Sequence, residues 1–71
     1  MLPDEPVDVM VVGGGGREHA ICAKLAESNR VQTVFCAPGN GGTANCTKVK
    51  NVDLKVDDFS GIARFAAENK V

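Results

Sequence analysis

Four consecutive glycines, Gly13–Gly16, stand between an apolar run and Arg17. Glycine lets the backbone approach a ligand without interference from a Cβ atom, and the free N–H groups at the start of a helix attract anions, most often phosphate. Arg17 could add a charge-assisted pair of hydrogen bonds to the same oxygen atoms. The alternative is a tight turn with close strand–helix packing and no ligand. The predicted phosphate-binding residues are Gly13, Gly14, Gly15, Gly16 and Arg17.

His19 is the single histidine of the chain and falls in the first turn of the helix expected after the glycines. No nucleophile is identifiable beside it, so a packing or hydrogen-bonding role is favoured over acid–base catalysis. Glu18 is expected to complement the helix dipole or to hold a loop. Asp57 and Asp58 are interpreted as a helix cap. We therefore predict no catalytic residue and no metal ligand in this chain.

A second glycine-rich stretch follows the next expected strand. The carboxyl ends of parallel strands meet at one edge of an open sheet, where ligands bind, so the two stretches are expected to converge there. Backbone amides, with the side chains of Asn40 and Thr43, would hold a small phosphorylated molecule. A solvated connection with an Asn-Gly turn is the alternative. The predicted wall of this substrate cleft comprises Pro38, Gly39, Asn40, Gly41, Gly42 and Thr43.

The glycines do not match the usual dinucleotide fingerprint G-x-G-x-x-G, because Glu18 or His19 occupies the third glycine position. No acidic residue that could bind an adenosine ribose lies between the second strand and Asp53. A Walker A loop is excluded because no Lys-Ser or Lys-Thr follows the glycines. An NAD(P)-binding domain of an oxidoreductase, which titration with reduced nicotinamide would reveal, and a non-enzymatic nucleotide-sensing module are the alternative functions.

The elements expected around these stretches form a β-α-β unit. Residues 7–12 are a nearly continuous β-branched run, typical of a strand that is covered on both faces in a parallel sheet. Residues 17–28 favour a helix, which Asn29 would end in a left-handed conformation. Residues 31–37 favour a second strand, which Pro38 ends.

The remaining residues predict one more strand and one more helix. Residues 38–50 form a connection without periodicity, and residues 51–56 are expected to hold a short strand. Asp57 is the expected N-cap of a final helix. On that helix Phe59, Ile62, Ala63 and Ala66 fall on one face, with Phe65 beside it.

The predicted fold class is α/β, an open parallel sheet of about three strands and two helices. A further parallel strand is expected directly after Val71, so we interpret the chain as a fragment of a larger protein. Residues 1–6 are expected to be a flexible leader because Pro3 and Pro6 cannot donate ladder hydrogen bonds. Residues 7–71 are expected to be the partial domain.

Composition excludes several classes of partner. The 71 residues have a formal net charge of -1, and the basic residues do not cluster, so nucleic acid is an unfavoured partner. No segment is long and apolar enough for a membrane span. The three cysteines suggest neither a disulfide framework nor a zinc site, which favours reduced thiols and a cytoplasmic location.

Two segments together resemble a known family. Residues 9–44 read VMVVGGGGREHAICAKLAESNRVQTVFCAPGNGGTA, and residues 51–71 read NVDLKVDDFSGIARFAAENKV. They closely resemble the amino-terminal domain of the phosphoribosylamine–glycine ligases, also called glycinamide ribonucleotide synthetases. The pairing of G-G-G-G-R-E-H-A with A-P-G-N-x-G-T carries the resemblance. Gly41 departs from it, since alanine is frequent there in the family.

The resemblance implies a Rossmann-like pre-ATP-grasp domain of an ATP-grasp ligase in purine biosynthesis. Such an enzyme uses ATP and Mg²⁺ to activate glycine as an acyl phosphate, which the amine of 5-phosphoribosylamine attacks. The products are glycinamide ribonucleotide, ADP and phosphate. The implied partners are the two small substrates and the remaining domains of the parent chain.

The resemblance also implies how this chain would contribute. Residues 13–17, with His19, would contact the phosphoribosyl group, and residues 39–43 would form the opposite wall. The ATP and Mg²⁺ ligands would lie downstream, so the fragment alone is expected to bind no cofactor and to lack ligase activity.

Overall fold

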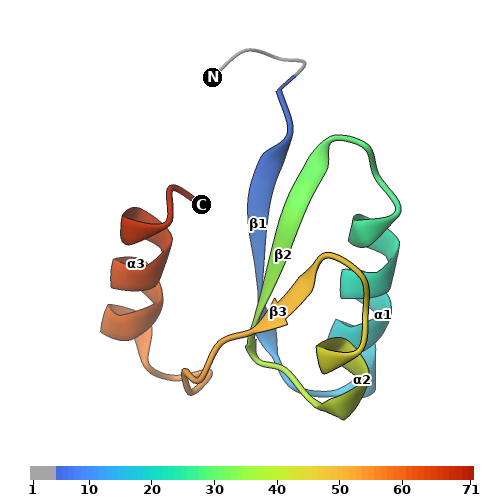
Figure 1. Ribbon diagram of the computed structural model, residues 1–71. Helices are drawn as coiled ribbons and strands as arrows, with labels where there is room; N and C mark the ends of the chain where they lie inside the picture. Colours follow the sequence, from blue (N-terminus) through green and yellow to red (C-terminus); the bar gives the residue numbers. More distant parts are fainter. Residues whose placement is uncertain (1–4) are drawn as a thin grey trace.

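The structure, a computed structural model that describes residues 5–71, is a parallel sheet with helices on both faces (Figure 1). In chain order the elements are β1 (Val7–Gly13), α1 (Gly16–Ala26), β2 (Val31–Pro38), α2 (Gly41–Ala44), β3 (Val49–Asn51) and α3 (Phe59–Glu68). The three strands lie in the order β1-β2-β3, and both pairings are parallel. The predicted open parallel α/β sheet is therefore confirmed. Residues 1–4 of the expected leader lie outside the described residues.

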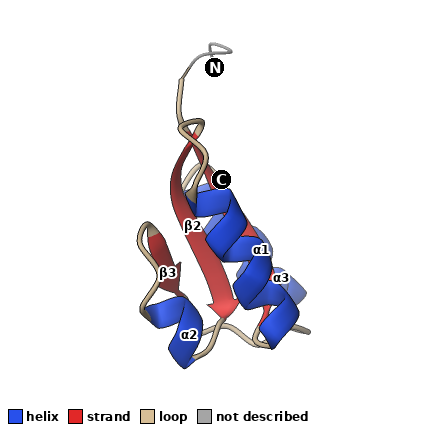
Figure 2. Cartoon of the chain, turned by 90° about the vertical axis from the view of Figure 1, so that its right-hand side faces the viewer, coloured by secondary structure: helices blue, strands red, loops and turns tan. Residues whose placement is uncertain are grey.

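The register of the strands brings their carboxyl ends to one edge of the sheet. Gly13 at the end of β1 pairs with Pro38 at the end of β2, and Asn51 at the end of β3 pairs with Cys36. On one side of the sheet α1 runs along β2, and α2 lies beside the end of β3 (Figure 2). Everything that follows the strands, including both glycine-rich stretches, therefore starts from the same edge.

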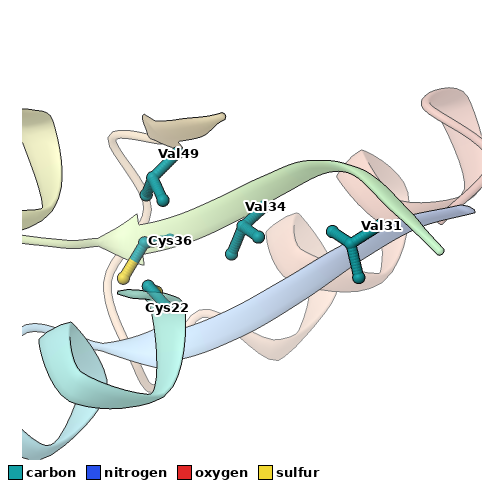
Figure 3. Packing of buried hydrophobic residues seen from close by; sticks show 5 residues of the cluster. All are labelled: Cys22, Val31, Val34, Cys36 and Val49. Carbon is teal, nitrogen blue, oxygen red and sulfur yellow. The ribbon is translucent and has the colours of Figure 1, made fainter. Parts of the chain in front are cut away.

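The core lies between α1 and the sheet. Cys22 of α1 and Val34 and Cys36 of β2 are fully buried, with Val31 and Val49 nearly so (Figure 3). Alternate residues of a strand face opposite sides, so Val34 and Cys36 share the face that α1 covers. The small β-branched and thiol side chains allow the helix to pack closely on the sheet.

The opposite face of the sheet carries α3. The ring of Phe65 packs edge-to-face on Phe35 of β2, with centroids 5.0 Å apart and planes at 78°. Of the residues predicted to share the apolar face of this helix, Ile62 and Ala66 are half-buried, as is Phe65, whereas Phe59 is 77% exposed and Ala63 is also exposed.

The connection predicted for residues 38–50 contains structure that periodicity did not reveal. The four-residue helix α2 is defined by a capping box, in which the side chains and backbones of Asn40 and Thr43 bond reciprocally. The third strand was also misplaced: it spans Val49–Asn51, because Val49 pairs with Val34 and is buried. Residues 5–71 thus contain three helices where two were expected.

The predicted carboxyl-terminal end of α1 was wrong. Asn29 does not adopt a left-handed conformation. Instead α1 ends when the amides of Glu27 and Ser28 donate to the carbonyls of Lys24 and Leu25, at 3.2 and 3.0 Å, so no left-handed residue is required.

At α3 the predicted N-cap was off by one residue. The cap is Asp58, whose Oδ1 accepts from the amide of Gly61 at 3.0 Å, and not Asp57. The other end closes with Lys70 in the left-handed region, at φ 58°. The amide of Val71 donates to the carbonyl of Ala66 and that of Lys70 to the carbonyl of Ala67, the pattern of a Schellman motif.

Candidate functional site

The two glycine-rich stretches contact each other at the carboxyl edge of the sheet. The amide of Gly39 donates to the carbonyl of Gly13 at 3.1 Å. The side-chain Nδ2 of Asn40 donates to the carbonyls of Gly14 at 2.9 Å and Gly15 at 3.3 Å. A Cβ atom on Gly14 would lie 2.9 Å from the carbonyl oxygen of Gly39, so glycine is needed for this approach. The expected convergence of the stretches is confirmed.

The start of α1 presents unpaired backbone donors. Gly15 is the N-cap and, having no side chain, provides no capping bond. Among residues 5–71, no acceptor bonds the amides of Gly16, Arg17 and Glu18, whereas His19 N donates to Gly15 O at 3.1 Å. These three donors stand at the positive end of the helix dipole, where an anion is favoured.

The charged residues of this turn differ in their surroundings. Arg17 is exposed, and no hydrogen bond or ion pair holds its guanidinium within the part of the chain that the structure describes. The Glu18 side chain folds back against Gly13 and Gly15, and a Cβ atom on Gly13 would overlap it. Glu18 therefore complements the helix dipole, as expected, while the side chain of Arg17 is available to a ligand.

His19 joins α1 to α2. A Cβ atom on Gly42 would lie 2.5 Å from both Cε1 and Nδ1 of the imidazole, so the ring packs directly on the backbone of α2. This contact agrees with the packing role favoured for His19. Contact of His19 with a phosphoribosyl group stays a prediction.

The polar side chains of the second stretch are engaged inside the protein. Asn40 Oδ1 accepts from the amide of Thr43 at 2.9 Å, and Thr43 Oγ1 accepts from the amide of Asn40 at 2.7 Å. Thr43 is fully buried, while Pro38 and Gly41 are exposed. The predicted contact of these residues with a ligand stays a prediction; in the structure Asn40 and Thr43 hold the stretch in shape.

Asn51 is a residue of this edge that the sequence analysis did not identify. Its Nδ2 donates to the carbonyl of Asn40 at 2.9 Å, and its Oδ1 accepts from Thr43 Oγ1 at 2.7 Å. A strand over residues 51–56 was predicted, in which Asn51 would be the first residue and would lie at the amino-terminal edge of the sheet. No local pattern marks Asn51, because β3 has three residues and its position is set by pairing with β2.

Some features are absent from residues 5–71. These residues contain no group of three or more His, Cys, Asp or Glu side chains arranged to hold a metal ion, and they enclose no pocket. None of the helices within the same range is long and apolar enough to cross a bilayer.

Known proteins are similar in sequence to most of this chain. Phosphoribosylamine–glycine ligase of Nostoc sp. is 55% identical over 58 residues, which cover 82% of this chain and 14% of the relative. The ligase of the same name from Allochromatium vinosum is 48% identical over 63 residues, 89% of this chain and 15% of the relative.

A third relative is a longer protein with a different name. The trifunctional purine biosynthetic protein adenosine-3 of Gallus gallus is 46% identical over 63 residues, 89% of this chain but 6% of the relative. The chain thus spans 15% or less of the length of these three relatives. Residues 7–71 match the model of a family described as phosphoribosylglycinamide synthetase, N domain. With the whole described sheet inside that match, the chain belongs to the family of phosphoribosylglycinamide synthetase N domains.

Proposed function

We propose that this chain is the amino-terminal part of an ATP-dependent ligase that joins glycine to 5-phosphoribosylamine in the cytoplasm. The family membership and the names of the relatives support this proposal. Because the chain spans so little of those relatives, we assign ATP, Mg²⁺ and glycine binding to downstream regions of the full-length protein. The three free cysteines agree with a reducing compartment.

The contribution of this chain, in our proposal, is to bind the phosphate of 5-phosphoribosylamine. The observation that supports this most directly is the set of unpaired amides at Gly16, Arg17 and Glu18, beside the exposed guanidinium of Arg17. A phosphate dianion can accept from these N–H groups and from both arms of the guanidinium. Gly16 carries no side chain, and a Cβ built there meets no atom within 4 Å, so the oxygen atoms can approach the backbone closely at this position.

The second stretch is proposed as the other wall of the cleft. The side chains of Asn40 and Thr43 are used internally, so residues 38–43 would contribute shape and backbone groups. His19, packed on Gly42, borders both walls. Residues 5–71 enclose no pocket, so the proposed cleft needs further walls from the rest of the full-length protein.

The proposed division of labour follows from the chemistry. ATP would phosphorylate the glycine carboxylate, giving the acyl phosphate and ADP. The amine of 5-phosphoribosylamine would then attack the acyl carbon, forming the amide bond as phosphate leaves and the nitrogen loses a proton. The residues of this chain hold the sugar phosphate at a fixed place, which lowers the entropic cost of bringing the amine to the acyl group. No residue of this chain is assigned to Mg²⁺, because no suitable group of ligands exists within residues 5–71.

Gly16→Ala in the full-length protein tests the phosphate site. No atom lies within 4 Å of a Cβ built on Gly16, so the fold accommodates alanine at this first helical position. The added methyl would instead crowd a ligand on the neighbouring amides. We expect the KM for 5-phosphoribosylamine to rise about tenfold, with KM for glycine and ATP and the thermal midpoint unchanged.

A matched pair of arginine variants completes this test. Arg17→Ala should raise the same KM by about tenfold or more, because a charge-assisted contact is lost. Arg30→Ala, an exposed arginine at the opposite edge of the sheet, should leave it unchanged. Absence of ligase activity in the unmodified full-length protein would contradict the proposed function. An unchanged KM for 5-phosphoribosylamine in both Gly16→Ala and Arg17→Ala would contradict the proposed phosphate site at the start of α1.

A further inference from the structure

We infer that Asn51 is a positioning residue for the proposed phosphate site. It acts through Asn40 on the first glycine-rich stretch, Gly13–Gly16, and does not touch the ligand. This inference rests on the proposed function. It begins with the place of Asn51 at the end of β3, level with Cys36 of the central strand. From there its carboxamide reaches two groups of the second stretch, the carbonyl of Asn40 and the hydroxyl of Thr43.

The hydrogen bonds of Asn51 are chemically consistent with one orientation of its carboxamide. Thr43 Oγ1 carries a single hydrogen, and it already accepts from the amide of Asn40. Two acceptors compete for that hydrogen, Asn51 Oδ1 at 2.7 Å and the Asn40 carbonyl at 2.9 Å. When the Thr43 hydroxyl donates to Asn51 Oδ1, the Asn40 carbonyl accepts instead from Nδ2 of Asn51, at 2.9 Å. One side chain thereby satisfies both the buried hydroxyl and the carbonyl.

Asn40 transmits this constraint to the first glycine stretch. Its backbone is held by Asn51, and its side-chain Nδ2 holds the carbonyls of Gly14 and Gly15. A trans peptide group is planar, with its N–H directed opposite to its C=O. Fixing the carbonyls of Gly14 and Gly15 therefore fixes the directions of the amides of Gly15 and Gly16, at the start of the proposed anion site.

Gly39 makes room for this arrangement. A Cβ atom at Gly39 would overlap Oδ1 of Asn51 and lie 2.8 Å from Thr43 Oγ1. Its φ of +76° is in the left-handed region that glycine adopts without cost. The close approach of Asn51 thus depends on glycine at this position.

The test is Asn51→Ala in the full-length protein. Loss of two hydrogen bonds leaves Asn40 free to shift, so the KM for 5-phosphoribosylamine should rise about tenfold. The KM for glycine and for ATP should stay within about twofold of the original values, because those sites are proposed to lie in other domains. Hydrogen exchange of the peptide that contains residues 40–44 should become faster.

Two further variants separate positioning from general stability. Asn69→Ala removes a side-chain bond of the same kind, from Nδ2 to the carbonyl of Phe65 at 2.9 Å, but at the end of α3. It should change neither the KM values nor exchange at residues 40–44. Asn51→Asp keeps the size of the side chain and an acceptor for Thr43 but places an oxygen against the Asn40 carbonyl. It should therefore behave like Asn51→Ala.

The outcomes distinguish this inference from the proposed function. If Arg17→Ala raises the KM for 5-phosphoribosylamine but Asn51→Ala only lowers the thermal midpoint, the inference is overturned and the function stands. An unchanged KM for 5-phosphoribosylamine and unchanged hydrogen exchange in Asn51→Asp would also overturn the inference, because the size of the side chain alone would then explain its effect. If the unmodified protein has no ligase activity, the proposed function fails. The inference about Asn51 is then tested by hydrogen exchange and by binding of ribose 5-phosphate in the unmodified protein and in Asn51→Ala. Unchanged exchange and binding in Asn51→Ala overturn the inference, and faster exchange with weaker binding supports it.

Discussion

At the scale of residues, two buried thiols lie next to each other where α1 packs on β2 (Figure 3). Cys22 and Cys36 are fully buried, while Cys46 is half-buried and its Sγ donates to the carbonyl of Gly42 at 3.3 Å. Burial raises the pKa of the Cys22 thiol to about 12, and the neighbouring Cys36 thiol adds to the rise. Cys22 therefore keeps its proton at neutral pH and is a poor nucleophile.

We expect a fixed order of alkylation. At about pH 8, iodoacetamide should modify Cys46 first, and Cys22 and Cys36 should react only when the core opens. Mass spectrometry of the labelled peptides, with a sample in urea as the control in which all three react alike, checks this order. Early labelling of Cys22 in the folded protein would contradict the packing described for the core.

The same shift predicts a pH dependence of stability. The pKa of Cys22 in the folded state lies above its ordinary value of 9.0, so folding favours the protonated thiol. That contribution is complete below pH 9.0 and is lost as the pH rises toward about 12. Replacing Cys22 with serine, which does not titrate there, should flatten this part of the stability profile.

At the scale of elements, α1 and α2 are coupled through the contact of His19 with Gly42. Gly41 and Gly42 are neighbours on the short helix α2, yet a Cβ atom on Gly42 would strike the imidazole and one on Gly41 would meet nothing within 4 Å. The two glycines therefore offer a matched pair of substitutions, identical in chemistry and different in packing.

Gly42→Ala should destabilise the domain by about 1–3 kcal/mol, because the imidazole must move away from α2. Gly41→Ala should be neutral or stabilising by up to about 1 kcal/mol, because alanine favours a helix and is less flexible when unfolded. Thermal unfolding of the two variants side by side measures the difference. Equal midpoints would mean that the His19 contact does not hold α2 in place.

The lengths of the elements explain which of them could be predicted from local sequence patterns. β1 was predicted from its nearly continuous β-branched run and α1 from its helix-favouring residues, and both predictions had small errors at the ends. The helix α2 has four residues and β3 has three, too few for any period. The pattern of Asn40 and Thr43 three residues apart was the available signal for α2, as a capping box.

At the scale of the whole molecule, the 71-residue chain by itself should have no ligase activity. It spans 14% to 15% of the two ligases that it resembles, and the sites for ATP, Mg²⁺ and glycine are proposed to lie in the remainder of the full-length protein. Release of phosphate from ATP with and without glycine measures this, with the full-length protein as the positive control. Glycine-dependent hydrolysis of ATP by the isolated chain would contradict the prediction.

The sequence alone determined the β-α-β order, the parallel sheet and the position of the glycine-rich stretches at its carboxyl edge. These follow from local periods and from residues that stop a strand, which act over a few neighbours along the chain. Only the tertiary structure decided that Asn40 holds the carbonyls of Gly14 and Gly15, that His19 packs on Gly42, and that Asn51 supports Asn40. Each of these contacts joins residues from different elements, and their geometry depends on the register of β3 and on how α1 and α2 pack at this edge of the sheet. Pairing and packing of distant segments set both, and no local pattern of residue types encodes them.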